Sequence, residues 1–166
     1  MKFNYSAFKA IYLHEMDRFR RTLMQSLLSP VLSTSLYFIV FGSVIGGYIE
    51  KIDGISYGSY IVPGLLMLTL LTQSITNTSF GIFFPKFNGT IYEILAAPIS
   101  TLEIVLAFVG AGATKTLVVG VVIFITANFF VEVDVKYPLL VVFLLMLVAF
   151  TFALFGFLIG LMSSNF

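Results

Sequence analysis

The chain has 166 residues, of which 59% are hydrophobic and only 10% are charged, and its formal net charge is +1. Soluble domains carry roughly 25% charged residues, so this composition excludes an ordinary soluble domain, and the apolar content excludes a disordered chain. The balanced charge gives no overall basic field for nucleic acid. The chain has no cysteine and one histidine, His14, which excludes disulfides, thiolate metal sites and histidine-rich metal sites.

Four apolar stretches organise the chain, and each has about the 20 residues that an α-helix needs to cross a bilayer. We expect an all-α membrane protein, because the stretches are continuous rather than alternating. Residues 1–166 are predicted to form one transmembrane domain. The predicted spans are residues 27–49, 59–83, 101–130 and 139–161.

Residues 4–23 precede the first span and show the periodicity of an amphipathic helix, which we expect to lie along the membrane surface. Glu15 falls on its apolar stripe, beside Phe8 and Phe19, where a carboxylate is costly unless it is paired. Two explanations remain open for it. One is an i,i+3 ion pair with Arg18, and the other is contact with a partner subunit.

The distribution of cations predicts the orientation, because cytoplasmic flanks of membrane spans carry the excess of Lys and Arg. Five cations precede the first span, whereas residues 50–53 and 132–136 each hold one Lys and two acids. We therefore expect the N-terminus and the end of the fourth span to be cytoplasmic. Lys86 is the only cation that marks the middle loop as cytoplasmic.

Residues 84–98 connect the second and third spans and contain a proline near each end, Pro85 and Pro98, which limits a short helix between them. Gly89 permits a tight turn just before this helix. Its apolar face is formed by Ile91, Ile94 and Leu95. This helix is interpreted either as a docking element or as a plain interfacial connector.

The third span begins with Ser100 and Glu103, which match a capping box, in which each side chain bonds a backbone N–H at the helix start. This pattern explains Glu103 without catalysis. The same span contains Gly110, Gly112 and Ala113, and the fourth contains Gly156 and Gly160 at GxxxG spacing. Such small residues allow neighbouring membrane helices to approach closely.

Lys115 lies about 21 Å along a helix from Thr101, which predicts a position near the bilayer midplane. An ammonium at this depth should face the bundle interior or a wet cavity. No acid of this chain is expected at matching depth. The candidate partners of this ammonium are therefore backbone carbonyls, a polar side chain such as Gln73, or a residue of another subunit. Two roles remain open for Lys115: a structural pair and a place in a translocation path. Gln73 and Asn77 could serve packing or binding.

The order of these elements resembles the permease subunits of ABC-2 type ABC transporters, in particular those of the bacterial inner membrane. The resemblance runs through nearly the whole chain. The segments that carry it are His14–Phe19, Gln25-Ser26, Ser29-Pro30-Val31, Leu36–Gly42, Tyr60–Met67, Lys86–Ser100 and the glycine-rich stretch that ends at Lys115.

This resemblance implies a transport subunit without catalytic residues or bound cofactors of its own, working as an exporter with a separate ATPase that binds ATP and Mg²⁺. It also implies a second permease copy, residues 5–21 as a connecting helix, and residues 88–97 as the coupling helix that docks on the ATPase. Asn88, Gly89 and Glu93 belong to that coupling helix. Glu15 and Glu93 become candidates for contact with basic groups of the ATPase.

Length is where the chain departs from this family, whose permeases usually have six spans rather than four. The chain is therefore expected to be a truncated product, a fragment or one part of a split permease. The alternative function is a partnerless membrane protein, either a small secondary carrier or a fragment that does not transport. Secondary carriers usually show internal repeats and intramembrane carboxylates, and neither is obvious here. A membrane enzyme is the least favoured alternative, because no catalytic pair can be named.

Overall fold

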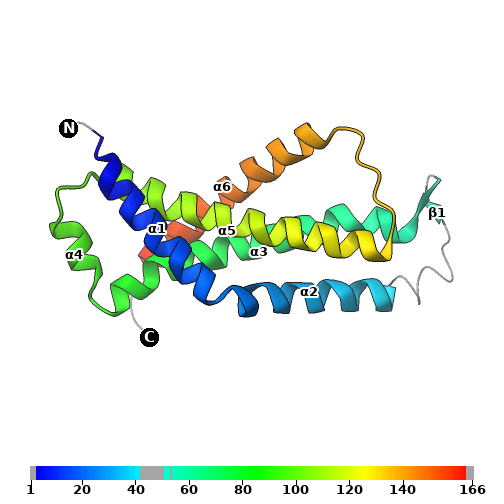
Figure 1. The fold of residues 1–166 in the computed structure, drawn as a ribbon, viewed down its shortest axis with the longest axis horizontal. Coiled ribbons are helices and arrows are strands. Elements are labelled where there is room, and N and C mark those ends of the chain that lie inside the picture. Colours follow the sequence, from blue (N-terminus) through cyan, green and yellow to red (C-terminus); the bar gives the residue numbers. More distant parts are fainter. Residues whose placement is uncertain (1–2, 42–50, 53, 164–166) are drawn as a thin grey trace.

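The computed structural model describes residues 3–41, 51–52 and 54–163 of the chain, which form helices and one short hairpin (Figure 1). The helices are α1 (Tyr5–Arg21), α2 (Leu23–Val40), α3 (Tyr57–Phe87), α4 (Ile91–Ala96), α5 (Thr101–Phe130) and α6 (Pro138–Met162). The hairpin pairs β1 (Lys51–Ile52) antiparallel with β2 (Ile55–Ser56) and had no counterpart in the sequence prediction.

Four of the described helices, α2, α3, α5 and α6, are long and apolar enough to cross a membrane. The predicted all-α membrane fold is therefore confirmed. The helix α5 has the predicted bounds, α6 differs by one residue at each end, and α3 is longer than predicted. The described part of the first span is α2, and residues 42–49 of the predicted span lie outside the described residues.

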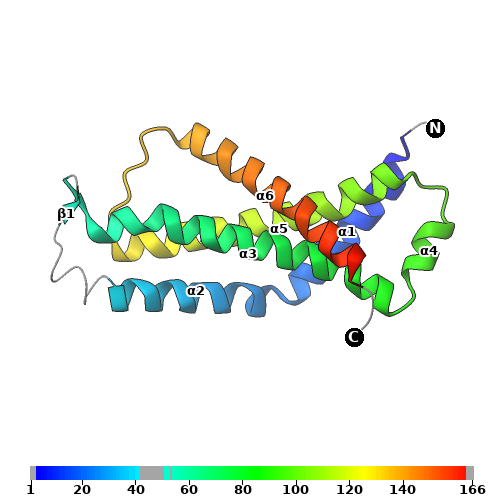
Figure 2. The same ribbon diagram turned by 180° about the vertical axis from the view of Figure 1, so that it is seen from behind.

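The helices α3 and α5 form the centre of the bundle, with α2 alongside them and α6 crossing α3 obliquely (Figures 1 and 2). This crossing is close because α6 presents two glycines to α3. A Cβ atom at Gly156 would lie 2.5 Å from the carbonyl oxygen of Ile75, and one at Gly160 would lie 2.7 Å from that of Ser79. The GxxxG prediction of close helix approach is thus confirmed.

The helix α1 packs along the first half of α5. Phe19, on its apolar stripe, is buried in a cluster with Leu66, Leu70 and Val119, and Met16 packs against that cluster. These stripe residues therefore contact α3 and α5. The sequence had instead predicted that this helix lies along the membrane surface. The sequence pattern shows that one face is apolar but not whether lipid or protein covers it.

The connection between α3 and α5 differs from its prediction. Pro85 does not limit a separate helix, because α3 continues through it to Phe87. The helix α4 is shorter than the helix predicted over residues 88–97. Residues 88–90 instead form a turn in which Gly89 has φ +78°. This left-handed conformation strains residues with a side chain, so glycine is suited to the position.

Candidate functional site

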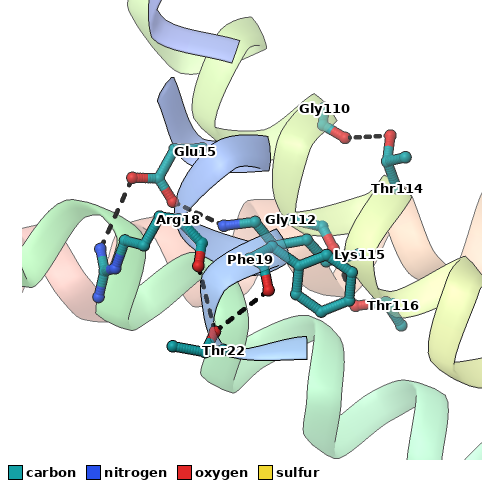
Figure 3. Close-up of polar contacts among 9 residues, drawn as sticks. All are labelled: Glu15, Arg18, Phe19, Thr22, Gly110, Gly112, Thr114, Lys115 and Thr116. Atoms are coloured by element: carbon teal, nitrogen blue, oxygen red, sulfur yellow. Dashed lines mark hydrogen bonds and ion pairs between the residues drawn. The ribbon is translucent and has the colours of Figure 1, made fainter. Parts of the chain in front are cut away.

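The candidate site lies at the junction of α1 and α2, where both helices meet α3 and α5 (Figure 3). Thr22 separates α1 from α2, and its hydroxyl donates hydrogen bonds to the carbonyl oxygens of Arg18 and Phe19. The first span, which begins at Leu23, therefore starts two residues after Arg21, where α1 ends. This junction fixes the last turn of α1 against the middle of α5.

A buried ion pair joins α1 to α5 at this level. The ammonium of Lys115 donates a hydrogen bond of 2.7 Å to the carboxylate of Glu15, and the two side chains are only 7% and 3% exposed. The expectation that no acid of this chain reaches Lys115 is therefore wrong. Glu15 is also too enclosed to contact basic groups of an ATPase, so that assignment is withdrawn.

Arg18 forms a second, longer ion pair with the same carboxylate. Its Nη1 lies 3.6 Å from Oε1 of Glu15, so the i,i+3 pair, one of the two explanations left open for this carboxylate, is present. The guanidinium also lies over the ring of Phe84, with 4.6 Å between Cζ and the ring centroid. One carboxylate thus faces two cations, and the cluster carries a formal charge of +1.

The depth of Lys115 follows from the lengths of the helices. With 30 residues, α5 is about 45 Å long, which exceeds the roughly 30 Å of hydrocarbon. Its far end lies beside the start of α3, because the hydroxyl of Ser59 donates a hydrogen bond to the carbonyl of Glu132, just past α5. Lys115 is the fifteenth of these 30 residues, so it lies halfway along α5.

The polar residues of α3 are placed differently from the prediction. Gln73 does not pair with Lys115, and its side-chain oxygen instead accepts a long hydrogen bond of 3.5 Å from the amide of Asn77. Asn77 lines the same small pocket as Lys115. The structure therefore brings Asn77, but not Gln73, to the site.

The capping box at the start of α5 is present. The hydroxyl of Ser100 accepts from the backbone N–H of Glu103, and the carboxylate of Glu103 accepts from the backbone N–H of Ser100. The same carboxylate also accepts from the backbone N–H of Asn4, the N-cap residue of α1. Glu103 therefore anchors the start of α1 to α5, a contact that local sequence patterns do not reveal.

The helix α4 lies at the end of the bundle, beside the described N-terminal and C-terminal residues (Figure 1). Ile91 and Ile94 pack against the core cluster, so the predicted apolar docking face is turned partly inward. The exposed side of α4 instead carries Tyr92, Glu93 and Leu95. Asn88 is the exposed C-cap residue of α3.

No group of three or more His, Cys, Asp or Glu side chains that could hold a metal ion occurs in the described ranges. The charged groups of the site are instead one carboxylate and two cations that tie α1 to the bundle. Together with four long apolar helices, these features define a multi-pass membrane protein.

Comparison with known proteins gives the family. The model of the ABC-2 type transporter family matches residues 6–166, so the chain belongs to this family. The chain is 38% identical over 160 residues to the inner membrane transport permease YadH of Escherichia coli (strain K12) and to the protein of the same name from Shigella flexneri. The alignment covers 96% of this chain and 62% of each relative, so the chain spans less than two thirds of their length. No solved structure matches it.

Membership of this family supports a role as a transmembrane transporter subunit. Its apolar helices and its similarity to inner membrane permeases agree with a multi-pass protein of the bacterial inner membrane. The predicted family and localisation are confirmed.

Proposed function

We propose that this chain forms part of the permease of an ATP-driven exporter, in which a separate ATPase subunit binds ATP and Mg²⁺ and two permease copies enclose the path. Family membership carries this proposal. The proposal assigns no substrate. It also places the N-terminus and α4 on the cytoplasmic side.

The distribution of cations supports this orientation. The described N-terminal and C-terminal residues lie at the same end of the bundle as α4 (Figures 1 and 2). Arg20 and Arg21 are exposed on the last turn of α1, and Lys86 lies in the last turn of α3. Positive charge at this end is typical of a cytoplasmic flank.

The proposed ATPase contact is the exposed side of α4. Tyr92 and Leu95 are 73% and 63% exposed, and Glu93 stands between them in the sequence. An exposed aromatic next to an aliphatic residue and a carboxylate suits a protein interface, whose energetic anchors are often aromatic.

Movement of α4 would reach the membrane helices through its inner side. Ile91 and Ile94 pack on the core cluster that contains Ile104 and Phe108 of α5 and Ile82 of α3. Because cores are densely packed, a displacement of α4 pushes on both helices. We propose that this tilts α3 and α5 and opens a path between two subunits.

The test is purification of the chain from its native membrane in mild detergent, followed by mass spectrometry of accompanying proteins. We expect an ABC ATPase. The variant Tyr92→Ala should recover roughly tenfold less of it, because an interface anchor is lost. The matched control is Tyr137→Ala, since Tyr137 is 72% exposed at the other end of the bundle. Recovery of the chain alone would contradict the proposal and favour a partnerless protein. Equal recovery of the ATPase with both variants would contradict the proposed contact at α4.

A further inference from the structure

A small pocket opens beside the buried ion pair, between the junction of α1 and α2 and the faces of α3 and α5. Its volume is about 100 Å³. Its lining combines both cations of the cluster with hydroxyl and amide groups and two phenylalanines. Besides Glu15, Arg18 and Lys115, the lining includes Ser26, Thr76 and Asn77.

The charges of this pocket favour an anion. Glu15 is the only acid in the lining, and it faces Lys115 at 2.7 Å and Arg18 at 3.6 Å. Because the close pair with Lys115 neutralises the carboxylate, the charge of Arg18 is left in excess. A cation that is partly withdrawn from water attracts an anion more strongly than a fully hydrated one does.

Several N–H donors of the pocket make no hydrogen bond to any described residue. An ammonium has three N–H donors, and the hydrogen bond of Lys115 to Glu15 occupies one of them. Arg18 makes no side-chain hydrogen bond to a described residue, because its distance to Glu15 exceeds hydrogen-bond length. Its Cζ lies 4.6 Å from the centroid of the Phe84 ring, a cation–π contact that occupies none of its N–H donors in a hydrogen bond.

Neutral donors complete the arrangement. The hydroxyls of Ser26 and Thr76 have no hydrogen-bond partner among the described residues, and both line the pocket. A group that accepts from Arg18 and from two hydroxyls needs several acceptor oxygens around one centre. A phosphate group has this form, and guanidinium groups bind it through paired hydrogen bonds.

We propose that this pocket binds a phosphate group, held by the guanidinium of Arg18 and the hydroxyls of Ser26 and Thr76, with the ammonium of Lys115 beside it. The pocket is smaller than the roughly 300 Å³ that drug-sized ligands require, so it takes a headgroup and not a whole molecule. The site lies where the first span begins, so the phosphate is supplied either by a phospholipid headgroup or by a soluble phosphate. This site does not depend on an ATPase partner.

The experiment measures thermal unfolding of the purified, delipidated chain in neutral detergent at fixed ionic strength. Three additions are compared: phosphatidylglycerol in mixed micelles, a neutral diacylglycerol in mixed micelles, and inorganic phosphate. The variants are Arg18→Gln and Thr76→Val, and the matched control is Arg20→Gln, which removes the same charge from the exposed side of α1. Size-exclusion profiles verify that each variant is folded.

We expect phosphatidylglycerol to raise the unfolding temperature in a saturable way, while diacylglycerol does not. Arg18→Gln should weaken this apparent affinity about tenfold, and Thr76→Val several-fold, whereas Arg20→Gln leaves it unchanged. Saturable stabilisation by inorganic phosphate with the same order of variants would assign the site to a soluble phosphate. The proposal is overturned if neither phosphate source stabilises the chain, or if Arg20→Gln weakens binding as much as Arg18→Gln.

Discussion

Removal of the Glu15 carboxylate should destabilise the chain far more than removal of an exposed carboxylate on the same helix. In Glu15→Gln, the buried ammonium of Lys115 loses the acid that lies 2.7 Å away. Breaking a buried ion pair from one side costs about 3–5 kcal/mol. Because about 1 kcal/mol shifts Tm by roughly 2–4 °C in a chain of this size, we expect a fall in Tm of about 10 °C.

The two partners of the pair are not equivalent. In Lys115→Met, the carboxylate of Glu15 keeps Arg18 at 3.6 Å as a counter-charge, so we expect a smaller loss, about 1–2 kcal/mol. In Glu15→Gln, no other described acid lies within ion-pair distance of Lys115. The double variant should recover much of the stability that Glu15→Gln loses, because it leaves no buried charge without a partner.

The assay is thermal unfolding in detergent, monitored by circular dichroism, for the two single variants and the double variant. Asp17→Asn is the control, because Asp17 is exposed on α1 and should change the free energy of unfolding by no more than about 0.5 kcal/mol. Equal losses in Glu15→Gln and Asp17→Asn would refute the buried pair. Strict additivity in the double variant would refute the coupling.

Three further predictions concern packing, a tether and a helix cap. Gly156→Ala should lower the free energy of unfolding by about 1–3 kcal/mol, because the added Cβ would lie 2.5 Å from the Ile75 carbonyl oxygen. The control Gly64→Ala should leave it unchanged, because no atom lies within 4 Å of the Cβ added there. Lys86→Met should speed amide hydrogen exchange at the end of α6, because the ammonium of Lys86 donates 2.7 Å hydrogen bonds to the carbonyls of Leu161 and Ser163. Unchanged exchange would contradict this tether. Ser100→Ala should lower the free energy of unfolding by about 1 kcal/mol through loss of the N-cap, and thermal unfolding that matches the unsubstituted chain would count against it.

Features set by nearby residues were predictable from the sequence. The predicted start of α5 was correct because a capping box, formed by Ser100 and Glu103, marks it. The pair of Glu15 with Arg18 was one of two explanations considered from the sequence, because residues three apart share one face of a helix. Local spacing therefore carries the positions of helices and of pairs within them.

Contacts between distant segments were not predictable in this way. Lys115 and Glu15 are 100 positions apart, and the spacing of residues within either helix does not indicate that these two side chains pair. The predicted end of α3 was wrong for a related reason. Pro85 lacks a backbone N–H and usually disrupts a helix, yet here the helix continues through it to Phe87. Tertiary packing decides such cases, and one sequence does not display it.

The pairing of α1 with α5 has a consequence for synthesis of the protein. Ribosomes complete Glu15 one hundred residues before Lys115, so α1 emerges with Arg18 but without Lys115, the closer of the two cations that this carboxylate faces in the folded chain. When α5 enters the bilayer, its lysine costs about 2.5–3.5 kcal/mol if it is unpaired near the centre of the span. Glu15, which is synthesised first, then provides the counter-charge for Lys115. Docking of α1 onto α5 removes this cost, so insertion of the third span and closure of the N-terminal helix onto it are coupled steps of biogenesis.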